Sequence, residues 1–262
     1  MGVPKTLIIA GREFRGFLRM PLGYVLLAVY ALVSGMALVT LLFLFHDQLQ
    51  RLAQQAMMAT PSQAVIDVQL SVLTPYLFNT AALLLFIVPF LTMRAFAEEK
   101  RSRSLEVLVS YPLSAWQIVL GKFLGVYAFM LLLLAITAGH LAILAAVSTP
   151  EILPVVGGFA GLLLLGAALV AIGLFISSLT VGQVEAAVLT LGLFLVLVMA
   201  GEMAGPGATM LQSVMGYVSP LYQYQGFGRG VLAFDAVLSY AAATLLYLAL
   251  TLRGVDLLKW RG

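Results

Sequence analysis

The sequence predicts an all-α polytopic membrane protein with six transmembrane helices and an N-terminal interfacial amphipathic helix. Hydrophobic residues make up 62% of the chain and charged residues 10%, whereas ordinary globular proteins have about 45–50% and about 25%. Six apolar segments are long enough, or nearly so, to cross a hydrocarbon core, which takes about 20 residues as a helix. Twelve of the fourteen Lys and Arg residues can be placed on one side of the membrane.

Residues 3–20 are expected to form a helix in the membrane interface. At 100° per residue the cations cluster on one side of that helix and the apolar side chains on the other. The cations are Lys5, Arg12, Arg15 and Arg19, and the apolar residues are Leu7, Ala10, Phe14, Phe17 and Leu18. Pro21 then breaks this helix before the first span. The alternative is a basic tail without regular structure.

The six spans belong to a single transmembrane domain that occupies residues 1–262. They are predicted at residues 22–45, 76–93, 115–147, 153–179, 184–200 and 236–252. The first apolar run is too long for a signal-peptide core, so it is expected to be an uncleaved anchor. The start of the third span is well marked, because Ser114 and Gln117 form an S-x-x-Q capping box and Leu113 and Ile118 occupy the positions of a hydrophobic staple.

The basic residues orient these spans. Four precede the first span, five lie around the loop between the second and third, and three follow the sixth, which leaves only Arg51 and Arg229 on the other side. The positive-inside rule therefore places both termini in the cytoplasm. The expected location is the cytoplasmic (inner) membrane of a prokaryote. The same distribution accounts for the net charge of +3, so the lipid bilayer is the expected partner and no nucleic acid is.

The region 201–235 is expected on the extracytoplasmic side. It opens with Gly201, Gly205, Pro206 and Gly207, continues through an apolar stretch, and breaks at Ser219–Pro220. Two short re-entrant helices fit this pattern, and a plain external loop fits it almost as well.

The spans carry little that could support chemistry. His140 is the one deep titratable residue, and it is interpreted as a neutral side chain hydrogen-bonded to a neighbouring helix rather than as a proton relay. No G-x-S-x-G surrounds Ser177–Ser178, and the chain has no cysteine and no P-loop motif. We therefore expect no catalytic, cofactor-binding or metal site and no enzymatic activity in this chain. Any energy for transport should come from a partner subunit.

A docking surface for such a partner is expected in the loop at residues 94–113. Its segment E-E-K-R-S-x-S-L-E-V-L-x-x-x-P-L-S begins at Glu98 and is followed by W-Q-I-V-L-G-K. By composition alone this is a solvated loop, in which Glu99 can pair with Arg103 and Arg103 with Glu106.

The loop resembles the signature loop of type-2 ABC exporter permeases, in particular the group of the gliding-motility-associated permease. The resemblance extends to S-P-L-x-x-x-x-G-F-x-R-G-V-L at 219–232 and to the six-span layout. Arg103 departs from it, because a glycine, which permits a turn, is expected before Ser104.

The resemblance implies that the loop forms a cytoplasmic coupling helix that inserts into an ABC ATPase subunit. The implied contact residues are Glu98, Glu99, Arg101, Ser104 and Glu106. The implied outer-gate residues are Pro220, Gly226, Phe227 and Arg229. ATP and magnesium would be bound in the partner ATPase, and the permease would pair with a second copy of itself or a related permease.

The sequence thus favours the permease subunit of an ATP-driven exporter that forms the translocation path as a dimer with separate ATPase subunits. The alternatives are a membrane scaffold or maturation subunit without solute transport, and a secondary transporter. An intramembrane enzyme is the least supported. Copurification of an ATPase separates the exporter from a secondary transporter, and transport in vesicles separates it from a scaffold.

The predicted orientation can be tested by cysteine labelling, because the chain contains no cysteine. A cysteine introduced at Ser102 should react with an impermeant maleimide only after the cells are opened, because the basic residues hold that loop inside. Rapid labelling in intact cells would invert the topology.

Overall fold

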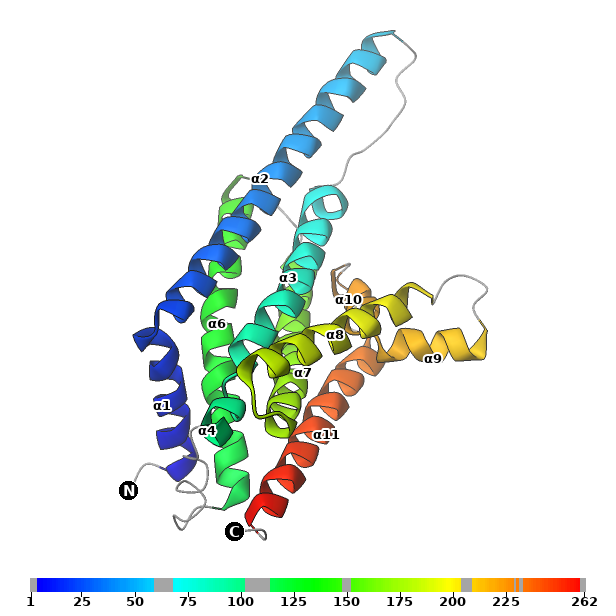
Figure 1. Ribbon diagram of the computed structural model, residues 1–262. Helices are drawn as coiled ribbons and strands as arrows, with labels where there is room; N and C mark the ends of the chain where they lie inside the picture. The colour runs from blue at the N-terminus through cyan, green and yellow to red at the C-terminus, as the bar shows by residue number, and fades with distance from the viewer. Residues whose placement is uncertain are drawn as a thin grey trace.

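The computed structural model describes residues 4–58, 68–101, 114–147, 152–203, 209–228, 230 and 233–259. These residues are almost entirely helical and include no strand (Figure 1). The all-α fold class predicted from the sequence is confirmed.

Six helices in the described part of the chain are long and apolar enough to cross a membrane. They are α2 (Pro21–Met58), α3 (Thr74–Thr92), α6 (Ala115–Val147), α7 (Ile152–Leu179), α8 (Gln183–Glu202) and α11 (Phe234–Lys259). The shorter elements are α1 (Lys5–Arg19), the π-helix η1 (Gln69–Leu73), α4 (Ala97–Arg101), α9 (Met210–Val218) and α10 (Pro220–Gly228). Helices α2 and α11 extend beyond the predicted spans at 22–45 and 236–252, and α9 and α10 lie within the region 201–235.

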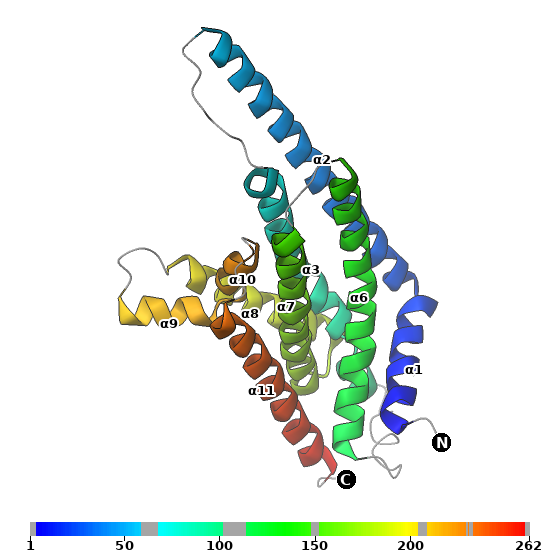
Figure 2. The same ribbon diagram turned by 180° about the vertical axis from the view of Figure 1, so that it is seen from behind.

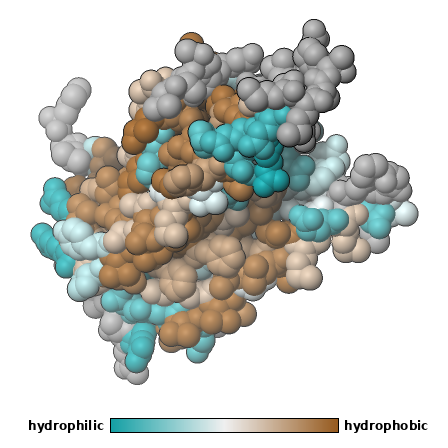
Figure 3. Space-filling view, turned by 90° about the horizontal axis from the view of Figure 1, so that it is seen from above, coloured by the Kyte–Doolittle hydropathy of each residue, from teal (hydrophilic) through white to brown (hydrophobic). Residues whose placement is uncertain are grey.

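Burial divides the spans into a core and a periphery. In the most apolar window of α3 and of α7, 67% of the residues are buried inside the molecule, against 22% for α2, α8 and α11. The outer helices expose large apolar side chains, and hydrophobic residues predominate on the face seen in Figure 3. In water such a surface would drive aggregation, whereas lipid tails solvate it. The exposed side chains therefore fit a membrane-embedded bundle.

Glycines on α7 permit close helix packing, as their spacing suggests. A Cβ atom at Gly161 would lie 2.7 Å from the Phe227 ring and 2.9 Å from that of Tyr224, and one at Gly166 would lie 2.2 Å from the sulfur of Met130. Small residues let helices approach each other in a membrane, where packing drives association. Gly161 thus sets the distance between α7 and α10.

The predicted break at Pro21 occurs where expected. Helix α1 ends at Arg19, Met20 is extended (φ −101°, ψ 142°), and α2 begins at Pro21. The turn is tight, because a Cβ atom at Gly23 would lie 2.1 Å from the carbonyl oxygen of Phe17.

The capping box at the start of α6 is also confirmed, since Ser114 and Gln117 exchange hydrogen bonds of 3.2 Å. Leu113 of the predicted staple lies outside the described residues.

Helix α1, helix α4, the start of α6 and the end of α11 lie at the same end of the bundle (Figures 1 and 2). The far end of α2 projects beyond the other helices on the opposite side (Figure 1). The segments that carry most of the basic residues therefore share one end. That this end faces the cytoplasm stays a prediction from the positive-inside rule.

Replacing Gly161 with leucine should destabilise the protein, because the new side chain must displace two buried aromatic rings of α10. Overpacking of this kind costs about 1–3 kcal/mol. Gly139→Leu is the matched control, since a Cβ atom there meets nothing within 4 Å. The thermal unfolding midpoint in nanodiscs should fall for Gly161→Leu and not for Gly139→Leu. Equal midpoints would contradict close packing at Gly161.

Candidate functional site

The candidate site is the junction between the end of α3 and the start of the short helix α4. Residues 93–96 form a turn, and Ser177 of α7 closes it. The Ser177 hydroxyl accepts hydrogen bonds from the backbone N–H groups of Phe96 (3.1 Å) and Ala97 (3.2 Å) and donates to the Met93 carbonyl (3.2 Å). The first N–H groups of a helix have no partner within it, and a capping oxygen satisfies them. Helix α7 thereby fixes where α4 begins.

Lys122 of α6 lies at the centre of this junction. Its side chain is 1% exposed, and its ammonium lies 2.9 Å from Oε1 of Glu13 and 2.9 Å from Oε1 of Glu99. The ammonium also donates to the Ala95 carbonyl and stands 5.1 Å from the centre of the Phe96 ring. A buried ammonium needs such compensation for lost hydration. Lys122 thus joins α1, α4 and the turn before α4.

Arg12 completes a cluster of two cations and two carboxylates. Its guanidinium lies 3.0 Å from Oε1 of Glu99 and 3.3 Å from Oε1 of Glu13. We call Arg12, Glu13, Glu99 and Lys122 the junction cluster. Burial raises the pKa of Glu13, but Lys122 and then Arg12 outweigh that effect and hold the pKa below its usual value. Glu13 is therefore ionised at neutral pH, and its stabilising effect would fade as the pH falls from the ordinary carboxyl pKa through that lowered pKa.

Close packing of α1 on α6 brings Glu13 to Lys122. A Cβ atom at Gly121 would lie 2.7 Å from Ile9, and one at Gly125 would lie 2.8 Å from the Ala10 carbonyl oxygen. One turn further on, the rings of Phe17 and Phe129 stack with centroids 4.8 Å apart. The apolar side of α1 therefore packs in part against α6, whereas the sequence suggested lipid tails alone. The interfacial placement of α1 stays a prediction.

Two further cations secure the segment 93–101. Arg94 lies 3.2 Å from the Glu98 carboxylate, stands 5.7 Å from the centre of the Phe17 ring and contacts the sulfur of Met20. Lys100 donates to the carbonyl oxygen of Ser178 on α7. Helix α4 is consequently bound to α1, α6 and α7, although it is only five residues long. These contacts also give the Ser177–Ser178 pair a structural role.

The residues predicted to contact an ATPase differ in where they point. The Glu99 side chain is 17% exposed and faces the junction cluster, whereas that of Glu98 is 41% exposed and Arg101 is exposed. Ser104 and Glu106 lie outside the described residues, as does Arg103, so the pairs predicted for Arg103 are not described. Glu98 and Arg101 are therefore the described candidates for an outward contact.

Sequence reasoning missed Glu13 and Lys122. Glu13 is the single acidic residue of α1, beside the basic Arg12, and this was a signal that a partner cation lay elsewhere. Lys122 was counted only as a flanking charge, although it follows the start of α6 by two helical turns. Its partners lie 109 and 23 positions away in the sequence, so the spacing gave no hint of the cluster.

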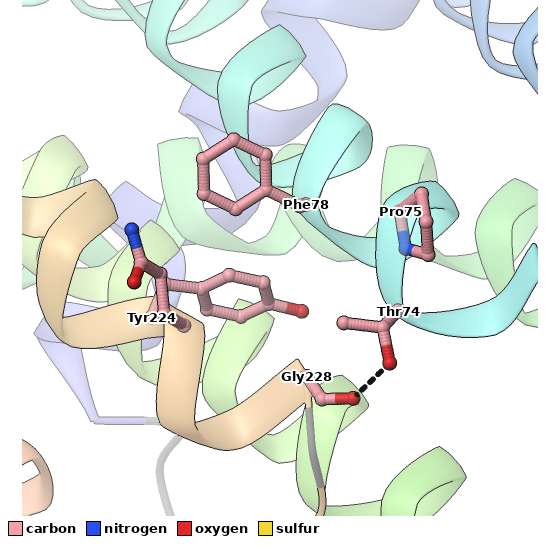
Figure 4. Close-up of a pocket in the computed structure, with 6 residues that line it drawn as sticks. Thr74, Pro75, Phe78, Tyr224 and Gly228 are labelled. Carbon is pink, nitrogen blue, oxygen red and sulfur yellow. Dashed lines mark hydrogen bonds between the residues drawn. The ribbon is translucent and has the colours of Figure 1, made fainter. Parts of the chain in front are cut away.

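At the opposite end of α7, helix α10 is held by three neighbouring helices. Tyr224 donates to the Gly158 carbonyl (3.0 Å), Tyr240 to that of Pro220 (2.6 Å), and Thr74 to that of Gly228 (2.8 Å). Figure 4 shows the last bond beside a cavity of about 310 Å³ between α3 and α10. Helix α10 is thus fixed to α7, α11 and α3.

The predicted outer-gate residues fall on or just after α10. Pro220 and Phe227 are buried, Gly226 is half-buried, and Arg229 lies outside the described residues. Their assignment to a gate stays a prediction.

His140 is hydrogen-bonded to Tyr76 of α3 at 2.7 Å, which confirms its interpretation as a side chain bonded to a neighbouring helix.

Comparison with known proteins identifies a family. Residues 7–255 match the family model described as ABC-2 family transporter protein. No curated protein matches the chain. The matched range includes every helix described above except the first residues of α1 and the last residues of α11.

Within the described residues, no group of three or more His, Cys, Asp or Glu side chains is placed to hold a metal ion.

Replacing Lys122 with methionine should destabilise the protein strongly, because Glu13 and Glu99 then lose their shared buried counter-charge. Removing one partner of a buried ion pair costs about 3–5 kcal/mol. Arg51→Met is the control: the Arg51–Asp47 pair is 2.8 Å long but exposed, and such pairs contribute at most about 1 kcal/mol.

The triple variant Lys122→Met, Glu13→Gln, Glu99→Gln should recover much of the stability lost in Lys122→Met. The amides that replace the two carboxylates are neutral and need no buried cation. Thermal unfolding in nanodiscs measures all three proteins. A single Lys122→Met variant as stable as Arg51→Met would mean that the cluster contributes nothing.

Proposed function

The chain belongs to the ABC-2 transporter family, and we propose that it is the membrane subunit of an ATP-driven exporter whose ATPase subunits are separate chains. Family membership supports the permease assignment and, in general, an ATPase partner and a paired arrangement. The export direction rests on the resemblance of the loop at 94–113 to exporter permeases. ATP and magnesium would be bound by the partner, in the cytoplasmic membrane of a prokaryote with both termini inside.

The observation that carries this proposal is the attachment of α4 to three other helices. A permease driven by a separate ATPase needs a cytoplasmic segment whose displacement moves the membrane helices. Helix α4 opens the predicted coupling loop and is bound to α7 through Ser177, to α6 through Lys122, and to α1 through Arg12. A push on α4 would therefore reach three helices at once.

We further propose that the two adjacent glutamates of α4 have different roles. Glu98 pairs with Arg94 but stays partly exposed, and it would meet the ATPase together with the exposed Arg101 and the residues that follow. Glu99 faces Lys122 and Arg12 and would hold α4 in position instead. The sequence assigned both residues to the same contact surface.

The double substitution Glu98→Lys, Arg101→Glu should weaken capture of the cognate ATPase about tenfold, which corresponds to about 1.4 kcal/mol. Reversed charges at a docking surface disfavour the matching partner. Asp47→Lys is the control, since Asp47 is an exposed carboxylate on the end of α2 that projects from the opposite side of the bundle. Copurification of the ATPase with the tagged permease measures the effect.

ATP-dependent transport by the wild-type pair in reconstituted vesicles tests the function itself. Unchanged ATPase capture by the double variant would remove Glu98 and Arg101 from the docking surface. ATPase capture and ATP hydrolysis without any ATP-dependent transport would favour the scaffold or maturation subunit.

A further inference from the structure

A layer of hydrogen-bonded polar side chains crosses α2, α3 and α6 within the membrane-spanning region. The Tyr30 hydroxyl lies 2.6 Å from that of Thr137, and the Tyr76 hydroxyl lies 2.7 Å from Nδ1 of His140. Ser34 donates to the carbonyl of its own helix at 2.6 Å, as hydroxyls in membrane helices commonly do. Polar groups in hydrocarbon need such partners, because no water is present to replace them.

Asn79 of α3 is the exception in this layer. Its side chain is exposed, and within the part of the chain that the structure describes its amide forms no hydrogen bond. It lines a groove of about 340 Å³ between α2 and α3. The two other polar residues of the groove are not bonded to it, since Ser34 and Thr80 donate to backbone carbonyls of their own helices.

The groove places Asn79 inside the hydrocarbon core, at the level of Ser34. Ser34, which lines the same groove, lies halfway along the apolar run 21–45 of α2. That run is about 36 Å long at 1.5 Å per residue, slightly more than the hydrocarbon thickness of about 30 Å. Lipid headgroups cannot reach this depth, and lipid tails offer neither a donor nor an acceptor. An amide left against them is strongly unfavourable.

The rest of this face is apolar and aromatic. Phe86 (49% exposed) and Phe90 (41% exposed) follow Asn79 at i+7 and i+11, which places all three on one side of α3. This exposed strip belongs to a helix that is otherwise among the most buried of the molecule. No charged side chain is among the described residues that line the groove.

We propose that a second copy of this chain covers the α2–α3 groove and that the two Asn79 amides hydrogen-bond to each other at a two-fold contact. A two-fold interface brings the same surface of each copy together. An amide suits that position because it carries both a donor and an acceptor, and asparagine strengthens helix association in membranes. The inference rests on the paired permease of the proposed function and assigns its interface.

Cysteine cross-linking tests the contact directly, because the chain contains no cysteine. Asn79→Cys should form a disulfide-linked dimer on mild oxidation in native membranes. Leu245→Cys is the matched control, as Leu245 is 66% exposed on α11, and it should stay monomeric. No cross-link at position 79 overturns the proposal. Labelling of that cysteine by a water-soluble maleimide would then identify the groove as part of a water-filled path.

A second measurement tests the hydrogen bond. Asn79→Leu should raise the dimer dissociation constant in lipid about three- to tenfold, as for other polar contacts between membrane helices. Asn79→Gln keeps the amide and should stay within about twofold of wild type. An unchanged constant for Asn79→Leu, measured by fluorescence energy transfer on dilution, would refute the amide contact. Neither readout requires an ATPase, so a failure of the coupling proposal would leave both unaffected.

Discussion

The buried ammonium of Lys122 is the constraint on which the organisation of one end of the molecule depends. Removing an ammonium from water costs several kcal/mol even after relaxation, so the fold must supply acceptors in fixed positions. Three chain segments provide them: Glu13 from α1, Glu99 from α4, and the Ala95 carbonyl from the turn between α3 and α4. None of these can move far alone without exposing a buried charge. The junction should therefore move as a unit.

Predictability from the sequence follows the range of each interaction. The spans were predictable because solvation by lipid depends on local composition, and the Ser114 capping box because its partners are three residues apart. The Lys122 cluster was not, because residues far apart in the chain meet only after α1 packs on the glycines of α6. Asn79 was not predicted as a contact residue for a related reason. The sequence shows an asparagine in an apolar run, but only the structure shows that it lies on the exposed side of α3.

The same distinction separates the two halves of the candidate docking surface. Sequence resemblance selected Glu98 and Glu99 together, since both belong to one motif. Adjacent residues on a helix differ by 100° in direction, so one can point outward while the other points into the bundle. The contacts assign the directions here: Glu99 faces Lys122 of α6, whereas Glu98 pairs locally with Arg94 and stays partly exposed. A motif alone cannot separate contact from positioning when both fall on one short helix.

Helix α7 links the two ends of the molecule. Ser177 near its end closes the turn before α4, and Gly158 and Gly161 near its start hold the aromatic side chains of α10. Gly158 and Ser177 are nineteen positions apart, which is about 28 Å along a helix and close to the hydrocarbon thickness of about 30 Å. Because α7 is largely buried and closely packed at both ends, bending it would cost contacts along its length. If an ATPase displaced the α4 junction, as proposed, α7 would therefore tilt as a rigid body more readily than it would bend, and α10 would move with it.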